Sequence, residues 1–197
     1  MEYLKAGSLH FDPRPQMSRI FAEGFYEHGF KHFSKDKDKL ARATEHIFLL
    51  DSFYVAVDSG ETIMAIVGCT DKKPPPIKLD RKILQRELGF SRGGLAFWGI
   101  NKFSVNHEYP FEMPPQTGSI EFVATAPEHM GKGVAFGLLS HVMEAEPFSD
   151  YVLEVIDTNT PAIRLYEKLG FKEFMKTPSP KRSGFNNFVY MRTASSE

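Results

Sequence analysis

Hydrophobic residues in the first fifty positions recur at helical spacing. One stripe predicts a helix over about residues 16–30, and its members are Met17, Ile20, Phe21, Gly24, Phe25 and His28. After an alternating charge run at 35–39, a second stripe predicts a shorter helix, and it consists of Leu40, Ala43, Ile47 and Leu50. Two helices are therefore expected before the first strand.

The middle of the chain changes to a strand pattern and is then interrupted. Residues 53–57 and 62–68 are rich in β-branched and aromatic residues around the turn Asp58-Ser59-Gly60-Glu61, which predicts an antiparallel hairpin. Three prolines at 74–76 end it, since proline fits neither a helix interior nor a central strand. Beyond them, Asp80 is placed to cap a short helix that stops at Gly89.

The C-terminal half alternates strands and helices. Strands are predicted at 119–125, 151–156, 171–175 and 188–192, and helices at about 131–144 and 160–169. We therefore predict an α/β (α+β) fold, a mixed central sheet flanked by helices, with an antiparallel N-terminal hairpin and a β-α-β-α-β C-terminal half. The expected organisation is a single domain over 1–197 with an aromatic-rich insert at about 72–117.

Composition and charge exclude several classes of protein. The 197 residues include 24 Lys+Arg and 25 Asp+Glu, so the net charge of −1 argues against a nucleic-acid partner. A lone cysteine, Cys69, excludes an internal disulfide. No run of about 18 apolar residues and no secretory signal pattern is present. A cytoplasmic protein with no membrane partner is expected.

The densest chemical signal is a glycine-rich corner between a predicted strand and a helix, at residues 123–139. Small residues let a ligand approach the backbone, and the free N–H groups of the first helical turn favour an anion such as a pyrophosphate, with Lys132 adding a charge. A tightly packed turn is the alternative. The corner matches neither the Walker loop nor the dinucleotide fingerprint, because Gly133 and Phe136 stand where those motifs need other residues.

A second segment makes the anion-binding interpretation of the glycine-rich corner more specific. Residues 159–171 read Asn-Thr-Pro-Ala-Ile-Arg-Leu-Tyr-Glu-Lys-Leu-Gly-Phe, and with the corner they resemble the GNAT superfamily of acyl-CoA-dependent N-acyltransferases. The family's Arg/Gln-x-x-Gly-x-Gly/Ala signature aligns with Met130–Ala135, where Met130 departs from it. The Asn-x-x-Ala-x-x-Leu-Tyr-x-x-x-Gly-Phe run matches at every named position. The resemblance is specific over about 119–175 and does not cover 72–117.

The resemblance implies acetyl-CoA as co-substrate and no metal. The strands at 119–125 and 151–156 would splay apart, and the pantetheine arm would pair with the edge of the first. Asn159 would hydrogen-bond the arm. The implied cofactor-binding residues, with Tyr166 facing the thioester sulfur, are Val123, Ala124, Thr125, Gly131, Lys132, Gly133, Val134, Ala135, Phe136, Asn159 and Tyr166.

Transfer of an acetyl group to an amine needs a base for the amine and an acid for the departing thiolate. Tyr166 is the expected acid. Glu154, in an apolar strand twelve residues earlier, is the expected base, directly or through water, and Glu121 is the alternative. The reaction expected is direct attack by a primary amine in a ternary complex, and the acceptor is a small-molecule amine or a peptide or protein amine. A non-catalytic acyl-CoA sensor or partner-docking module is the competing hypothesis.

Other features point to no further chemistry. His28 and His32 have the i, i+4 spacing of zinc ligands, but no catalytic glutamate lies between them and no third ligand is evident. Cys69 ends an apolar strand and is expected to pack as a small hydrophobe. The insert at 72–117 concentrates aromatic residues, so it is a substrate-binding loop, a packing flap or a homodimer contact.

Overall fold

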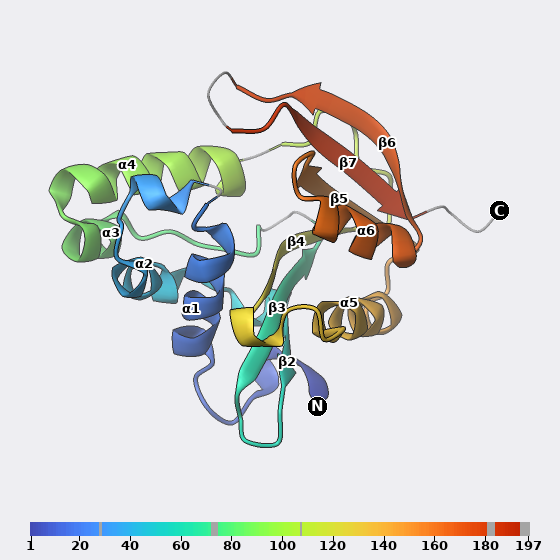
Figure 1. The fold of residues 1–197 in the computed structure, drawn as a ribbon, viewed down its shortest axis with the longest axis horizontal. Coiled ribbons are helices and arrows are strands. Elements are labelled where there is room, and N and C mark those ends of the chain that lie inside the picture. The colour runs from blue at the N-terminus through green and yellow to red at the C-terminus, as the bar shows by residue number, and fades with distance from the viewer. Residues whose placement is uncertain (28, 72–74, 107, 181–183, 194–197) are drawn as a thin grey trace.

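The protein was analysed as a computed structural model that describes residues 1–27, 29–71, 75–106, 108–180 and 184–193 (Figure 1). Its strands are β1 (Glu2–Lys5), β2 (Phe53–Val57), β3 (Ile63–Thr70), β4 (Thr117–Thr125), β5 (Asp150–Ile156), β6 (Phe171–Pro178) and β7 (Asn187–Thr193). Its α-helices are α1 (Arg14–Phe25), α2 (Lys37–Thr44), α3 (Arg81–Leu88), α4 (Phe90–Ile100), α5 (Val134–Ala145) and α6 (Thr160–Lys168).

The strands form one seven-stranded mixed sheet in the order β1-β2-β3-β4-β5-β7-β6. Only β4 and β5 pair in parallel, and every other neighbouring pair is antiparallel. The hairpin, the mixed sheet and the alternating C-terminal half confirm the predicted fold class.

Helices cover both faces of the sheet (Figure 1). On one face, α1 lies against β3 and β4, and it contributes Met17, Ile20 and Phe21 to an apolar cluster. On the other face, α5 lies against β2, β3 and β4, and it contributes Leu138 and Leu139 to a second cluster. A third apolar cluster joins α1 to α2, α3 and α4, which lie beyond the first layer (Figure 1). Burial of these apolar faces is the main driving force for the arrangement.

The insert is more helical than its sequence indicates. The predicted short helix is α3, and the Asp80 carboxylate caps it by accepting from the N–H groups of Lys82 and Ile83. The glycine-rich stretch beyond it forms α4, which the hydrophobic pattern did not predict. Gly93 explains the close packing of α3 and α4, because a Cβ there would lie 2.4 Å from Gln85 Cα.

The observed bounds of several helices and strands differ slightly from the predicted ones. Helix α1 ends at Phe25, short of the predicted residue 30, and the strand β1 at the sheet edge was not predicted. The second predicted helix is α2 followed by a 3₁₀ turn at Glu45–Ile47. His28 lies outside the described residues, so the expectation for His28 and His32 is not tested. In the ranges the structure describes, none of the helices has the length and apolar character to cross a membrane.

Candidate active site

The parallel pair β4–β5 separates halfway along its length. Register pairs run from Thr117–Asp150 to Ile120–Leu153 and then stop, although both strands continue. A register shift between Ile66 and Gly68 of β3 places a bulge in β4 opposite them, and Phe122 there has a φ of 53°. Bulges bend a strand and increase its twist, so the bulge accounts for the divergence.

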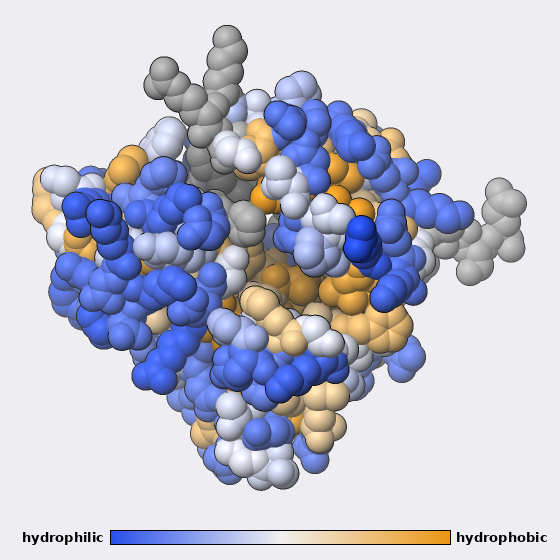
Figure 2. Space-filling model, viewed as in Figure 1, coloured by the Kyte–Doolittle hydropathy of each residue, from blue (hydrophilic) through white to orange (hydrophobic). Residues whose placement is uncertain are grey.

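Past Ile120, the edge of β4 that faces β5 has no strand partner within the described residues. This edge contains Val123, Ala124 and Thr125, whose other edge pairs with β3 where Ala124 meets Ile66. Figure 2 shows a hollow with hydrophobic walls at the centre of this face, between the positions of α1 and α6 in Figure 1. An extended arm with amide groups would fit this edge by strand addition.

The glycine-rich corner follows β4 directly and ends in α5. Gly131 and Gly133 have φ values of 72° and 78°, a region that favours glycine, and no atom lies within 4 Å of a Cβ added at either. Among the described residues, the six backbone N–H groups of residues 131–136 donate to no acceptor, and no side chain caps α5. An open corner with six free donors at a helix N-terminus fits a pyrophosphate.

Residues on either side of these donors leave the corner open. Met130, Lys132 and Phe136 are exposed, and Val134 is buried beneath them against the core. Lys132 therefore projects a full positive charge at the rim without an ion pair among the described residues. Both features fit the anion-binding role that the sequence predicts.

Asn159 has a structural role that sequence reasoning missed. Its side-chain oxygen accepts from the Ala162 N–H at 3.3 Å and caps the N-terminus of α6. The amide nitrogen of the same side chain keeps its two N–H donors for another acceptor. The cap orients α6, and through it Tyr166.

Tyr166 lies in the core between α6 and the sheet, where its ring contacts the ring of Phe171 with centroids 6.0 Å apart. The residue is 6% exposed, and its hydroxyl makes no hydrogen bond to the described part of the chain. Burial raises the pKa of Tyr166, which keeps the phenol protonated.

The two candidate bases come together just beyond the last β4–β5 pair. Glu121 follows Ile120 and Glu154 follows Leu153, so both carboxylates stand where the strands begin to diverge. Side-chain alternation places them on the face opposite Ile120 and Leu153, which pack in the core with Tyr166. Glu121 and Glu154 therefore lie on the sheet face opposite the core that contains Tyr166.

A residue that sequence reasoning missed lies between the two carboxylates. The insert carries Tyr109 to Ser119, whose Oγ lies 2.8 Å from the Tyr109 hydroxyl and donates to Glu121 Oε1 at 3.0 Å. Burial, with the nearby charges of Glu121 and Glu154, raises the pKa of Tyr109. The aromatic content of the insert was the only signal for this contact, and it did not identify the residue.

Tyr190 of β7 completes this side of the site. It stands opposite Glu154 in the β5–β7 register, and its ring lies 6.0 Å from that of Tyr109. Burial, with the charge of Glu154 adding to it, raises the pKa of Tyr190 to about 12. The two carboxylates are thus bordered by two protonated phenols.

The remaining sequence candidates lie away from this chemistry. Cys69 is buried under α5, and burial raises the pKa of its thiol to about 12, so it is a poor nucleophile. The described residues contain no group of three or more His, Cys, Asp or Glu arranged to hold a metal ion. A cavity of about 270 Å³ lies at α2 and α3, away from the opening, and charged side chains line most of it.

The sheet opens between its two parallel strands, and the uncapped glycine corner leads from the first of them into α5. The chain belongs to the acetyltransferase (GNAT) family, whose sequence model matches residues 14–171. This match extends across the insert, which the resemblance in the sequence did not cover. No curated protein matches the chain at a significant level.

Solved structures share the fold at low sequence identity. An N-acetyltransferase from Staphylococcus aureus Mu50 has a TM-score of 0.63 and 15% identity, with 98% of this chain and 100% of that chain covered. The ribosomal-protein-S18-alanine N-acetyltransferase from Escherichia coli has a TM-score of 0.55 and 16% identity, covering 100% and 94%. A GCN5-related N-acetyltransferase from Kribbella flavida has a TM-score of 0.57 and 18% identity, covering 97% and 95%.

Proposed function

We propose that this acetyltransferase transfers the acetyl group of acetyl-CoA to a primary amine by direct attack in a ternary complex. The observation that carries the proposal is the pair Glu121 and Glu154 at the start of the β4–β5 opening, with Tyr166 in the core on the other face of the sheet. In acyl transfer the amine adds to the face of the thioester carbonyl, and the thiolate then leaves from the tetrahedral intermediate. A base at the amine and an acid at the sulfur therefore serve two different steps of one reaction.

The glycine-rich corner would bind the co-substrate, and it would take no part in the proton transfers. The N–H groups of residues 131–136 and the charge of Lys132 would bind the pyrophosphate, and the edge at Val123–Thr125 would pair with the pantetheine arm. Met130 replaces the Arg or Gln of the signature, but the six backbone donors do not depend on that side chain. Binding through backbone groups is therefore expected to persist.

Glu154 is the preferred base in this proposal. The Ser119 hydroxyl already occupies one oxygen of Glu121, and Ser119 is tied in turn to Tyr109. A carboxylate has about four acceptor sites, so this hydrogen bond leaves Glu121 able to take a proton. Glu154 is likewise hydrogen-bonded, by the Tyr190 hydroxyl. We assign the base to Glu154 and keep Glu121 as the alternative. Glu154 would take the proton of the ammonium group, directly or through water, before the amine attacks.

Tyr166 would donate its proton to the departing sulfur. Its raised pKa keeps that proton in place until the thiolate develops. Cys69 offers no competing covalent route because its thiol is buried and protonated. Transfer without an acyl-enzyme intermediate is therefore the mechanism that these residues support.

The proposal is tested by incubating the protein with radiolabelled acetyl-CoA and a panel of amines. The panel contains a polyamine, an amino acid, an aminoglycoside and a peptide with a free N-terminus. Transfer of label to any one of them is the expected result. Tight binding of acetyl-CoA with no transfer to any amine would favour the acyl-CoA sensor and contradict the proposal.

Once an acceptor is found, carboxamide variants identify the base. Glu154→Gln is expected to lower kcat/KM about 100-fold or more and to abolish the acidic limb of its pH profile. Glu121→Gln is expected to have a smaller effect, and Glu173→Gln, at a solvent-exposed position of β6, serves as the matched control. A loss in Glu121→Gln that exceeds the loss in Glu154→Gln would reverse the assignment.

A further inference from the structure

Helix α4 presents apolar side chains to solvent. The helix is apolar around most of its circumference, and it buries Gly93, Ala96 and Ile100. On its outer side, however, Phe90, Leu95 and Trp98 are 78%, 50% and 56% exposed. A helix that is hydrophobic all round is normally covered, and a cluster of exposed large apolar residues marks an interaction surface.

The segment that contains α3 and α4 is rich in basic residues. Residues 78–105 contain six basic and two acidic residues, a net charge of +4 in a chain whose total is −1. The six basic residues, all exposed, are Lys78, Arg81, Lys82, Arg86, Arg92 and Lys102. Lys102 and Leu95 lie on the same outer stripe as Trp98, and the Lys102 ammonium lies 5.1 Å from the centre of the Trp98 ring.

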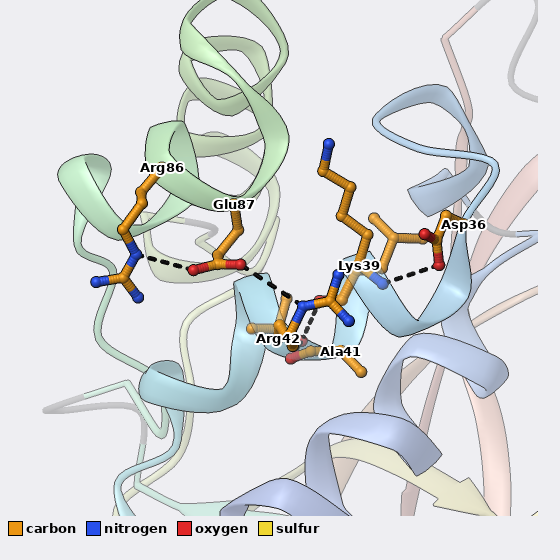
Figure 3. A network of polar contacts seen from close by, with 8 residues as sticks. Asp36, Lys39, Ala41, Arg42, Arg86 and Glu87 are labelled. Atoms are coloured by element: carbon orange, nitrogen blue, oxygen red, sulfur yellow. Dashed lines mark hydrogen bonds and ion pairs between the residues drawn. The ribbon is translucent and has the colours of Figure 1, made fainter.

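Both acidic residues of this segment are engaged within the molecule. Asp80 caps α3 through two backbone N–H groups. Glu87 accepts from Arg86 Nε at 2.8 Å and lies 3.7 Å from Arg42 Nε of α2, so that it bridges the two helices (Figure 3). Asp80 and Ser91 remain exposed, so the exposed side chains of the segment are mostly, but not all, apolar or positively charged.

We infer that the hairpin of α3 and α4 docks the protein onto an anionic lipid surface, with Trp98, Leu95 and Phe90 entering the headgroup region. Trp, Phe and Leu beside Lys and Arg form the composition of interfacial helices, and each basic residue near an anionic membrane adds to its affinity. Nothing in this contact requires a membrane-spanning helix. It goes beyond the proposed acetyl transfer and does not depend on it.

A second copy of the chain is a less suitable occupant. A two-fold contact would bring the same surface against itself, and so would place +4 opposite +4. Like charges facing one another across an interface oppose association. Charge complementarity thus selects a negatively charged surface, which a phosphatidylserine-containing bilayer supplies.

The experiment uses the full chain and its own fluorescence. Trp98 is the only tryptophan, so its emission reports on this surface alone. Vesicles of phosphatidylserine and phosphatidylcholine in equal amounts are expected to shift the emission to the blue and to sediment the protein, and added salt is expected to reverse both effects. Vesicles of phosphatidylcholine alone are expected to bind much more weakly.

Surface variants separate the apolar from the charged contribution. Arg81→Glu/Lys82→Glu is expected to weaken partitioning at least about 30-fold, from the loss of two positive charges near the lipid. Phe90→Ser/Leu95→Ser keeps the tryptophan and is expected to weaken partitioning on the order of tenfold or more. The matched control Lys172→Glu/Lys176→Glu reverses two exposed charges on β6 and is expected to bind as the unmodified protein does.

Three results would overturn the inference. The first is unchanged Trp98 emission and no sedimentation with the anionic vesicles, which would leave an acidic protein as the better partner. The second is equal binding to anionic and zwitterionic vesicles. The third is a blue shift without vesicles that rises with protein concentration, together with a dimer in sedimentation velocity, which would assign the surface to self-association.

Discussion

Replacement of Tyr166 by phenylalanine isolates a single hydroxyl. The ring stays buried in the same core, and no hydrogen bond to the described residues is lost, so the free energy of unfolding should change by less than about 1 kcal/mol. A general acid contributes about 100-fold to 10,000-fold to the rate. We therefore expect Tyr166→Phe to lower kcat by that factor, or ~3–5 kcal/mol of transition-state stabilisation.

The assay combines three measurements on one preparation. Steady-state kinetics give kcat, calorimetry gives the Kd for acetyl-CoA, and thermal melting gives stability. The matched control is Tyr151→Phe, which removes a core hydroxyl that donates to the carbonyls of Met143 and Glu146. The control should lose about 1 kcal/mol of stability and keep its kcat, the reverse of Tyr166→Phe.

The pH dependence adds a second criterion. Because burial raises the pKa of Tyr166, its proton is retained through the range in which an ordinary tyrosine titrates, near 10. The unmodified enzyme should therefore show no alkaline loss of kcat below pH about 10. Unchanged kcat in Tyr166→Phe would refute the acid role, whatever the pH profile.

Three further predictions concern the corner, the α6 cap and His46. Gly133→Val forces a β-branched residue to a φ of 78° and puts methyl groups into the open corner, so calorimetry should show acetyl-CoA binding at least about tenfold weaker. Asn159→Ala removes a helix cap and should lower the free energy of unfolding in urea by about 0.5–2 kcal/mol. Burial lowers the pKa of His46, whose Nε2 accepts from the Asp80 N–H, so the unfolded chain binds this proton more readily, and stability should fall as the pH drops below about 6.5. His46→Gln should flatten that pH dependence in thermal melts; an unaltered dependence would contradict the assignment to His46.

Short-range sequence patterns predicted the helices and strands that bury one of their faces in the core. The hairpin, the capped helix after Asp80 and the alternating C-terminal half all follow from short-range patterns, and each is present. By contrast, β1 is a four-residue edge strand, too short for a period to be read. Helix α4 contains three glycines, which disfavour a helix, and it is stabilised by the close approach of α3 at Gly93.

The candidate site likewise contains residues that local motifs predict and residues that long-range contacts place. The glycine corner and Tyr166 lie in short motifs that can be recognised in the sequence. Local backbone structure determines how the residues within each motif are arranged. The place of Tyr109 beside Ser119 depends on how Tyr109 and Phe111 pack against Phe174 and Tyr190, long-range contacts with no period or motif. Whether Glu154 faces Glu121 depends on the β4–β5 register, which is determined by pairs more than thirty residues apart.

The separation of β4 and β5 has a cause in the aromatic core between α1 and the sheet. Phe122 adopts a φ of 53°, a conformation that is strained for a bulky residue, so packing elsewhere must stabilise it. Its ring lies among Phe21, Phe25 and Phe53, at centroid distances of 5.6, 6.1 and 6.3 Å. Aromatic packing against α1 and β2 thus offsets the strain at the bulge. The N-terminal half of the chain, which provides none of the candidate catalytic groups, thereby keeps β4 and β5 apart beyond Ile120 and Leu153, where Glu121 and Glu154 follow.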